Sequence, residues 1–148
     1  MAVHLNTAEE LEIMREAGRI NAMALAAMRD AVRPGVSTLE LDQIAAEVLR
    51  KHGCTGAFVG YPPGSPHPFP ATIKASVNHE LVHGIPSADR ILQEGDIISL
   101  DCGTIYQGFV GDSAVTLPVG HISARAQHLL EVTREALRLA IEASRVGN

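Results

Sequence analysis

The sequence predicts an α+β fold of two layers, in which a mostly antiparallel sheet carries helices on one face. Two amino-terminal segments and one carboxyl-terminal segment combine helix-start residues with apolar side chains at helical spacing. The region between them alternates β-rich runs with turn residues. A chain of 148 residues that is 46% hydrophobic can bury a core, so we expect a single domain over residues 1–148.

Composition and charge argue against several functional classes. With 12 basic and 17 acidic residues and no tryptophan, the chain lacks the features of a nucleic-acid-binding surface. No run approaches the roughly 18 apolar residues that a membrane span needs. Met1–Asn6 has no basic region followed by an apolar run, so no signal peptide is expected. Cys54 and Cys102 are expected to be free thiols rather than a disulfide, which favours a cytoplasmic protein.

The helical segments have clear boundaries. Thr7 and Ser37 each begin a capping box, with a glutamate three residues later. Pro34 and Gly35 end the first segment, and Gly53 ends the second. A shift of 112 residues aligns the end of the first helix with the end of the last, which is a weak sign of an internal repeat. Helices are therefore expected over residues 7–32, 37–52 and 123–143.

The middle of the chain reads as strands and one long loop. Residues 61–70 contain five of the eight prolines, which excludes a helix or a central strand there. Short β-rich stretches lie at residues 54–60 and 71–82. Two longer runs between residues 95 and 117 flank a short turn and predict a β-hairpin.

Two aspartates of this hairpin are the first candidates for chemistry. If the hairpin turns on Tyr106 and Gln107, Asp101 and Asp112 face each other directly, with β-carbons about 4.5–5.5 Å apart. Two such carboxylates repel and need a shared proton or a cation. A pair of divalent metal ions about 3.5–4 Å apart fits this spacing best. Alternatively, a register slip of one residue would turn one aspartate toward solvent.

The stretch His79–His83 matches H-E-x-x-H, a zinc-binding motif that works only on a helix. Gly84 and Pro86 follow at once and favour an extended segment, in which residues four apart are about 13 Å apart. The flanking residues therefore disfavour the zinc-protease interpretation. His83 alone could be a catalytic or substrate-orienting imidazole, although a lone histidine is more often structural.

The scarce aromatic residues gather around the proline loop. Phe58, Tyr61 and Phe69 flank this loop and could line an apolar pocket. They could equally serve only to anchor the loop.

Several motifs together resemble one family. They are Ser76-Val77-Asn78, His83-Gly84-Ile85-Pro86, Gly95-Asp96-Ile97, and Asp101 followed by Gly111-Asp112-Ser113. In this order and spacing they resemble type I methionine aminopeptidases, and residues 12–19 are similar to that family's first helix. The resemblance implies the pita-bread fold, in which two pseudo-symmetric halves hold two divalent ions (Co, Mn, Fe or Zn) and a bridging water.

The resemblance also implies roles for particular residues. Asp112 would bridge both ions, and Asp101 would chelate one of them. His83 matches a histidine that contacts the substrate near the scissile amide. Phe58, Tyr61 and Phe69 fall where the methionine pocket is lined. The remaining ligands of the family, one histidine and two glutamates, belong to the second half of the fold.

The chain departs from the family in three respects. It ends before the residues that would supply the other ligands, so we expect the amino-terminal half plus the first helix of the second half. His79 stands where the family usually has an acidic residue. Lys74 stands where a small pocket residue is common, and the loop at residues 61–69 is longer than usual.

These observations lead to three functional expectations. The first is metal-dependent removal of the N-terminal methionine from new proteins, with weak or absent metal and little or no activity in this chain alone. The second is a catalytically silent half-domain that forms a homodimer or binds a partner. The third is a prolidase-like peptidase, which the His83-Gly84-Ile85-Pro86 motif disfavours.

Overall fold

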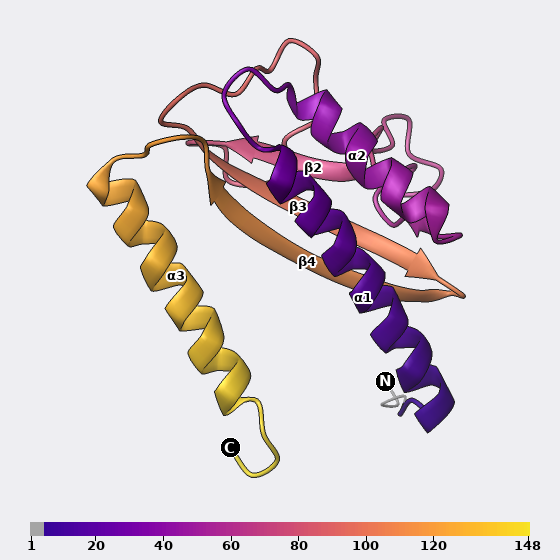
Figure 1. Cartoon of the computed structure of the whole chain (residues 1–148). Helices are drawn as coiled ribbons and strands as arrows, with labels where there is room; N and C mark the ends of the chain where they lie inside the picture. The colour runs from indigo at the N-terminus through magenta and orange to yellow at the C-terminus, as the bar shows by residue number, and fades with distance from the viewer. Residues whose placement is uncertain (1–4) are drawn as a thin grey trace.

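The computed structural model describes residues 5–148 and has the expected two layers (Figure 1). Two helices cover one face of a four-stranded sheet, and all strand pairings are antiparallel. The central strand β3 pairs with β4 on one side and with β1 and β2 on the other. The α+β prediction is confirmed. The elements are α1 (Ala8–Ala31), α2 (Thr38–Lys51), β1 (Thr55–Gly56), β2 (Ile73–Val77), β3 (Ile97–Tyr106), β4 (Phe109–Pro118) and α3 (Ala124–Ala143).

Both predicted capping boxes are formed. The Thr7 Oγ1 accepts a hydrogen bond from the backbone N–H of Glu10 at 3.2 Å, and the Glu10 carboxylate accepts one from the backbone of Thr7 at 2.7 Å. Ser37 and Glu40 repeat this arrangement at the start of α2. Such caps pair otherwise free amides of the first turn, which explains why these helices begin where the sequence predicts. The prediction about a signal peptide concerns residues that lie mostly outside those described.

The core lies between α1, α2 and the sheet. Its largest buried side chains come from both layers (Ile20, Met28, Leu41, Leu49, Ile73, Leu92, Ile98, Leu100 and Val119). Cys54 and Cys102 are also buried there as free thiols, as expected. Burial raises the pKa of the Cys102 thiol to about 12, so this group stays protonated and behaves as a small apolar side chain.

Gly111 allows α1 to approach β4 closely. A β-carbon added to Gly111 would lie 2.6 Å from the backbone carbonyl carbon of Ala17. Beside this contact, Thr104 donates a hydrogen bond to Asn21 Oδ1 at 2.8 Å, and the Asn21 amide donates one to Ser113 at 2.8 Å. The glycine and this polar network fix α1 on the sheet.

The hairpin register differs from the expected one. Gln107 and Gly108 form the turn with positive φ angles of 48° and 85°, so Tyr106 pairs with Phe109. The expectation that Asp101 and Asp112 are directly opposite is therefore wrong. The turn lies one residue later because a two-residue turn with two positive φ angles favours glycine at its second position.

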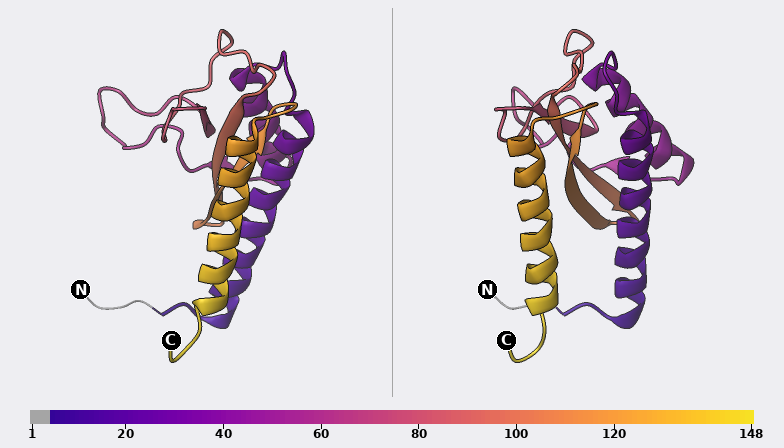
Figure 2. Two further views of the ribbon diagram at one scale, coloured as in Figure 1. Left: turned by 90° about the vertical axis from the view of Figure 1, so that its left-hand side faces the viewer. Right: turned by 60° about the vertical axis from the view of Figure 1, so that its left-hand side comes forward.

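The third helix has a different environment. Figures 1 and 2 show α3 leaving the end of β4 and running down one side of the molecule, toward the end where α1 begins. Leu130 is its one buried residue among those described. Five large apolar side chains of α3 are each more than half exposed (Leu129, Val132, Leu137, Leu139 and Ile141). Among the described residues, no helix combines the length and apolarity that crossing a membrane requires.

Candidate metal centre

Two carboxylates share the sheet face that α1 and α2 leave uncovered. Asp101 on β3 pairs with Ala114 on β4, and Asp112 on β4 pairs with Gly103 on β3. The two pairs are therefore two positions apart in the ladder. Because side chains alternate along a strand, Asp101 and Asp112 point to the same side as diagonal neighbours. The shift in register thus moved the pairing by two residues and kept both carboxylates on one face.

The pKa of Asp112 is affected by the charge of Asp101. Burial raises the pKa of Asp112, and the negative charge of Asp101 raises it further, while the positive charge of Lys74 acts in the opposite direction. A raised carboxyl pKa means that the folded chain disfavours a second negative charge at this place. A cation bound here would relieve that repulsion.

Lys74 is such a cation within the chain. Its residue on β2 is the direct cross-strand partner of Asp101, and its Nζ lies 3.2 Å from Asp101 Oδ2. The same Nζ lies 3.7 Å from the centre of the Phe58 ring. Sequence reasoning had noted Lys74 only as a departure from the family pattern. The pairing of β2 with β3 joins segments about 27 positions apart, and no local pattern gives its register.

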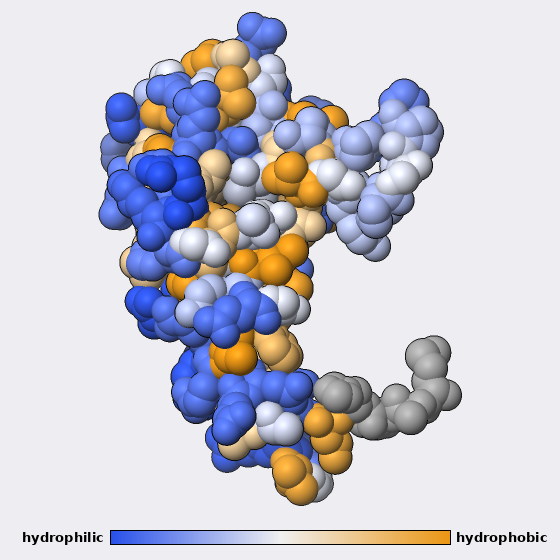
Figure 3. All heavy atoms as spheres, turned by 90° about the vertical axis from the view of Figure 1, so that its right-hand side faces the viewer, coloured by the Kyte–Doolittle hydropathy of each residue, from blue (hydrophilic) through white to orange (hydrophobic). Residues whose placement is uncertain are grey.

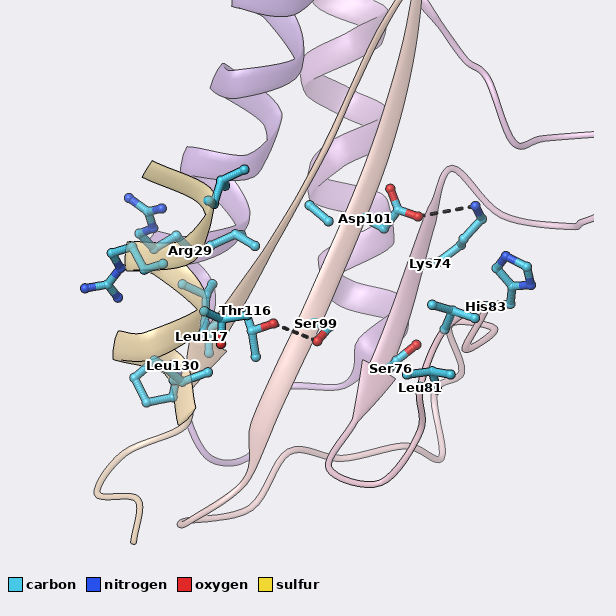
Figure 4. A pocket seen from close by; sticks show the side chains of 18 residues that line it. Arg29, Lys74, Ser76, Leu81, His83, Ser99, Asp101, Thr116, Leu117 and Leu130 are labelled. Atoms are coloured by element: carbon cyan, nitrogen blue, oxygen red, sulfur yellow. Dashed lines mark hydrogen bonds and ion pairs between the residues drawn. The ribbon is translucent and has the colours of Figure 1, made fainter. Parts of the chain in front are cut away.

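A cavity of about 850 Å³ lies on this side of the sheet. Lys74, His83 and Asp101 all line it, together with residues of β4 and α3. Figure 4 shows the Lys74 side chain directed at Asp101, with His83 on the loop beside β2. Figure 3 shows the molecule hollowed on one side, below a protruding loop, with apolar residues along the hollow. Asp112 is not among the described residues that line this cavity.

His83 is positioned by the glycine that follows it. The Gly84 carbonyl accepts a hydrogen bond from the Ala75 N–H at 2.9 Å, and the Gly84 N–H donates to Ser76 Oγ at 3.1 Å. A β-carbon on Gly84 would lie 2.2 Å from the Ala75 carbonyl oxygen. The close contact of Gly84 with β2 therefore requires glycine. It holds the exposed His83, with a φ of 63°, beside the cavity.

The H-E-x-x-H stretch is not a helix, which confirms the prediction that it lacks the helix a zinc site needs. Residues 79–83 form a turn and irregular chain. Glu80, which would be the general base in a zinc protease, instead accepts a hydrogen bond from the Val77 N–H at 2.6 Å and pairs with Arg90 at 3.2 Å. Its function in this structure is to fix the loop that carries His83.

The three aromatic candidates are only partly brought together. Phe58 and Phe69 meet edge to face, with ring centres 6.4 Å apart. Tyr61 is 65% exposed. None of the three is among the described residues that line the cavity. Phe58 nevertheless lies close to the carboxylates, because Lys74 rests on its ring.

Comparison with known proteins agrees with this geometry. The family model for metallopeptidase family M24 matches residues 12–148. The chain belongs to metallopeptidase family M24. Its curated relatives include methionine aminopeptidase 1 of Mycobacterium tuberculosis, which is 46% identical over 142 residues, and methionine aminopeptidase 1 of Bacillus subtilis, which is 48% identical over 141 residues.

Solved structures of M24 enzymes extend the comparison. The methionine aminopeptidase of Thermotoga maritima superposes with a TM-score of 0.89 and 37% identity, covering 95% of this chain and 54% of that one. An Xaa-Pro dipeptidase from Bacillus anthracis gives a TM-score of 0.69 and 27% identity, covering 84% and 32%. These alignments confirm the resemblance to methionine aminopeptidases and to about half of the pita-bread fold.

The extent of the match is also informative. The chain spans about half the length of the curated relatives. The match with the Mycobacterium tuberculosis protein covers 96% of this chain and 52% of that protein, and the match with the Bacillus subtilis protein covers 95% and 54%. The pita-bread relatives therefore contain a comparable length of structure that the matched region does not include.

The donor set of this M24 chain fits part of a metal centre. Within residues 5–148, no three or more His, Cys, Asp and Glu side chains gather in a way that could hold a metal ion. The carboxylates of Asp101 and Asp112 nevertheless share one face and repel each other. Carboxylate oxygens suit several divalent ions, so this pair fits as two ligands of a larger set.

Proposed function

We propose that this chain provides the carboxylate side of the metal centre of an aminopeptidase that removes N-terminal methionine. The observation that carries the proposal is the convergence of Asp101 and Asp112 on one sheet face, beside the cavity that His83 lines. The M24 family and the methionine aminopeptidase relatives support it. We further propose that residues 1–148 form one domain, equivalent to the amino-terminal half plus the first helix of the second half.

Each residue has a distinct part in this proposal. Asp112 and Asp101 would hold the divalent ions, with Asp112 shared between two ions and Asp101 bound to one of them. Divalent ions bound there would polarise the scissile carbonyl and lower the pKa of a bound water. His83, held by Gly84 at the cavity, contacts the substrate near the scissile amide and steadies the tetrahedral species. Phe58 and Phe69, with Tyr61, would supply an apolar surface for the methionine side chain.

A metal-binding measurement tests the ligand roles. Isothermal titration with Mn²⁺ is expected to give weak binding to the wild-type chain and loss of that binding in Asp112→Asn. Asp89→Asn is the matched control, because Asp89 is exposed on a loop outside the hairpin and does not line the cavity. Equal Mn²⁺ binding by wild type and Asp112→Asn would contradict the proposal.

Peptide assays test the reaction. Met-Ala-Ser with Co²⁺ or Mn²⁺ is the substrate for the methionine activity, and an Xaa-Pro dipeptide is the substrate for the prolidase-like alternative. Because the chain carries two of the ligands that the resemblance implies, we expect little or no turnover from it alone. Any turnover of Met-Ala-Ser should disappear in Asp112→Asn. We place this reaction in the cytoplasm, where new chains are processed.

A specific observation favours a second candidate, a silent module that assembles through α3. Leu137, one of the five exposed apolar residues of α3, lines the cavity together with Leu81 and Val82, which are 87% and 61% exposed. Apolar surface of this kind marks an interaction site. A homodimer could bury it. A stable dimer in light scattering, together with no turnover in the peptide assay, would support this candidate. A monomer at micromolar concentration would count against it.

A further inference from the structure

Lys74 occupies the place of a bound cation at Asp101. The two residues are direct cross-strand partners, so their β-carbons are held together by the backbone of β2 and β3. The Nζ–Oδ2 distance is 3.2 Å, and the side chains are 18% and 30% exposed. A half-buried pair fixed by strand register differs from the mobile ion pairs of a helix surface.

The ammonium also has a second site of attraction. It lies 3.7 Å from the centre of the Phe58 ring, whose face attracts a cation. The Phe58 ring is in turn held by edge-to-face contact with Phe69. The flexible stem of lysine therefore allows the ammonium to leave Asp101 without losing its contact with the aromatic ring.

An ammonium and a divalent ion at the Asp101 carboxylate compete for the same negative charge. Lys74 opposes the mutual repulsion of Asp101 and Asp112, which is what a metal ion would also do. A positive charge that remained at this place would repel an incoming divalent ion. We therefore expect metal binding at Asp101 to displace the lysine ammonium.

We propose that Lys74 is a built-in competitor of the divalent ion: its ammonium offsets part of the charge of the Asp101–Asp112 pair without metal and gives way at Asp101 when metal binds. This inference rests on the proposed ligand roles of the two aspartates. It deepens the proposed function by making Lys74 the residue that sets the metal concentration at which the centre fills.

Metal titration of the full chain tests the competition. Lys74→Met removes the charge and keeps much of the length, so Mn²⁺ should bind about tenfold or more tightly than to wild type. Lys74→Arg keeps a positive charge and should bind as weakly as wild type. Lys51→Met is the matched control, because it removes one positive charge from an exposed pair with Glu47 on α2. It should leave the Mn²⁺ affinity unchanged.

A second measurement needs no metal and applies even if a variant is less stable. Urea unfolding in EDTA is compared for wild type, Lys74→Met, Asp101→Asn and the double variant. Lys74→Met should lower the unfolding midpoint because two carboxylates then lose their counter-ion. Adding Asp101→Asn should restore part of that loss, so the two changes are non-additive. Additive changes would overturn the inference.

The outcomes separate this inference from the proposed function. If wild type binds Mn²⁺ and Asp112→Asn does not, but Lys74→Met binds no more tightly than wild type, the inference fails and the metal centre stands. If neither wild type nor Lys74→Met binds Mn²⁺, both fail. Tighter binding by Lys74→Met that Asp112→Asn abolishes supports both.

Discussion

The two faces of the sheet differ in the polarity and burial of their side chains. On the face that α1 and α2 cover, β3 contributes Ile98, Leu100 and Cys102, which are fully buried in a core of apolar side chains. On the other face, the same strand contributes Ser99 and Asp101, which are partly exposed and paired with other polar groups. One strand thus carries both the packing that holds the fold and the charges that could hold a metal.

This contrast shows where stability and function are separated. The covered face gains free energy from burying apolar area. The open face holds two like charges close together, at a cost that Lys74 offsets in part. Substitutions on the first face should therefore change folding, and substitutions on the second should change ion binding while changing folding little.

The largest effect is expected from Leu100→Ala. The side chain is fully buried between the sheet and the helices, so its removal leaves a cavity and should lower the free energy of unfolding by about 2–5 kcal/mol. Ser99→Ala, one residue away on the open face, is the matched control and should cost roughly 1 kcal/mol or less, for its hydrogen bond with Thr116. Urea unfolding measures both, and equal losses would break the distinction between the faces.

A second effect tests how closely α1 packs. Gly111→Ala would place a β-carbon 2.6 Å from the Ala17 backbone, and such overpacking should cost about 1–3 kcal/mol of unfolding free energy. Gly18→Ala is the control. Gly18 lies on α1 next to Ala17, but a β-carbon on it meets nothing within 4 Å. In a helix this control should gain roughly 0.5–1 kcal/mol. A loss at Gly18 or a gain at Gly111 in thermal unfolding would contradict the packing.

Local sequence patterns predicted one face better than the other. The capping residues Thr7 and Ser37 and the helical spacing after them gave correct boundaries, because these patterns act within a few residues. The turn at Gln107 and Gly108 was placed one residue early, although the glycine and its tolerance of positive φ were visible in the sequence.

The open face could not be read in the same way. That Asp101 and Asp112 share a side followed from the alternation of a strand and survived the register error, since the pairing moved by two. The ion pair of Lys74 with Asp101 did not follow, because it depends on the non-local pairing of β2 with β3. The placement of His83 likewise depends on the contact of Gly84 with β2, which no periodicity reveals.

A smaller effect concerns the carboxylate pair and depends on pH. Burial and the Asp101 charge raise the pKa of Asp112 in the folded chain above its unfolded value, so its ionised form destabilises the fold. This cost is present above the folded pKa and is relieved as pH falls through it toward the unfolded value. Because Asp112 is largely exposed and solvent screens its charge, Asp112→Asn should stabilise the metal-free chain at neutral pH by no more than about 0.5 kcal/mol.

The comparison across pH checks the cause of that gain. Unfolding of wild type and Asp112→Asn is measured in EDTA at neutral pH and again below the unfolded pKa of an aspartate, about 3.9. The difference between the two proteins should disappear at the lower pH, where Asp112 is protonated in both states. A gain that persists there would show that charge repulsion is not the cause.

The smallest effect on folding is expected in α3. Leu137 and Ile141 are 59% and 65% exposed on a helix with one buried residue among those described. Changing both to serine should alter the free energy of unfolding of the helix-covered part by less than about 0.5 kcal/mol, as is usual for surface positions. If the apolar face of α3 mediates self-association, light scattering of the double variant should show a lower mass than wild type. If the wild type is monomeric and the double variant nevertheless loses much stability, α3 unfolds together with the core. The helix would then not be separate from the packed part of the molecule.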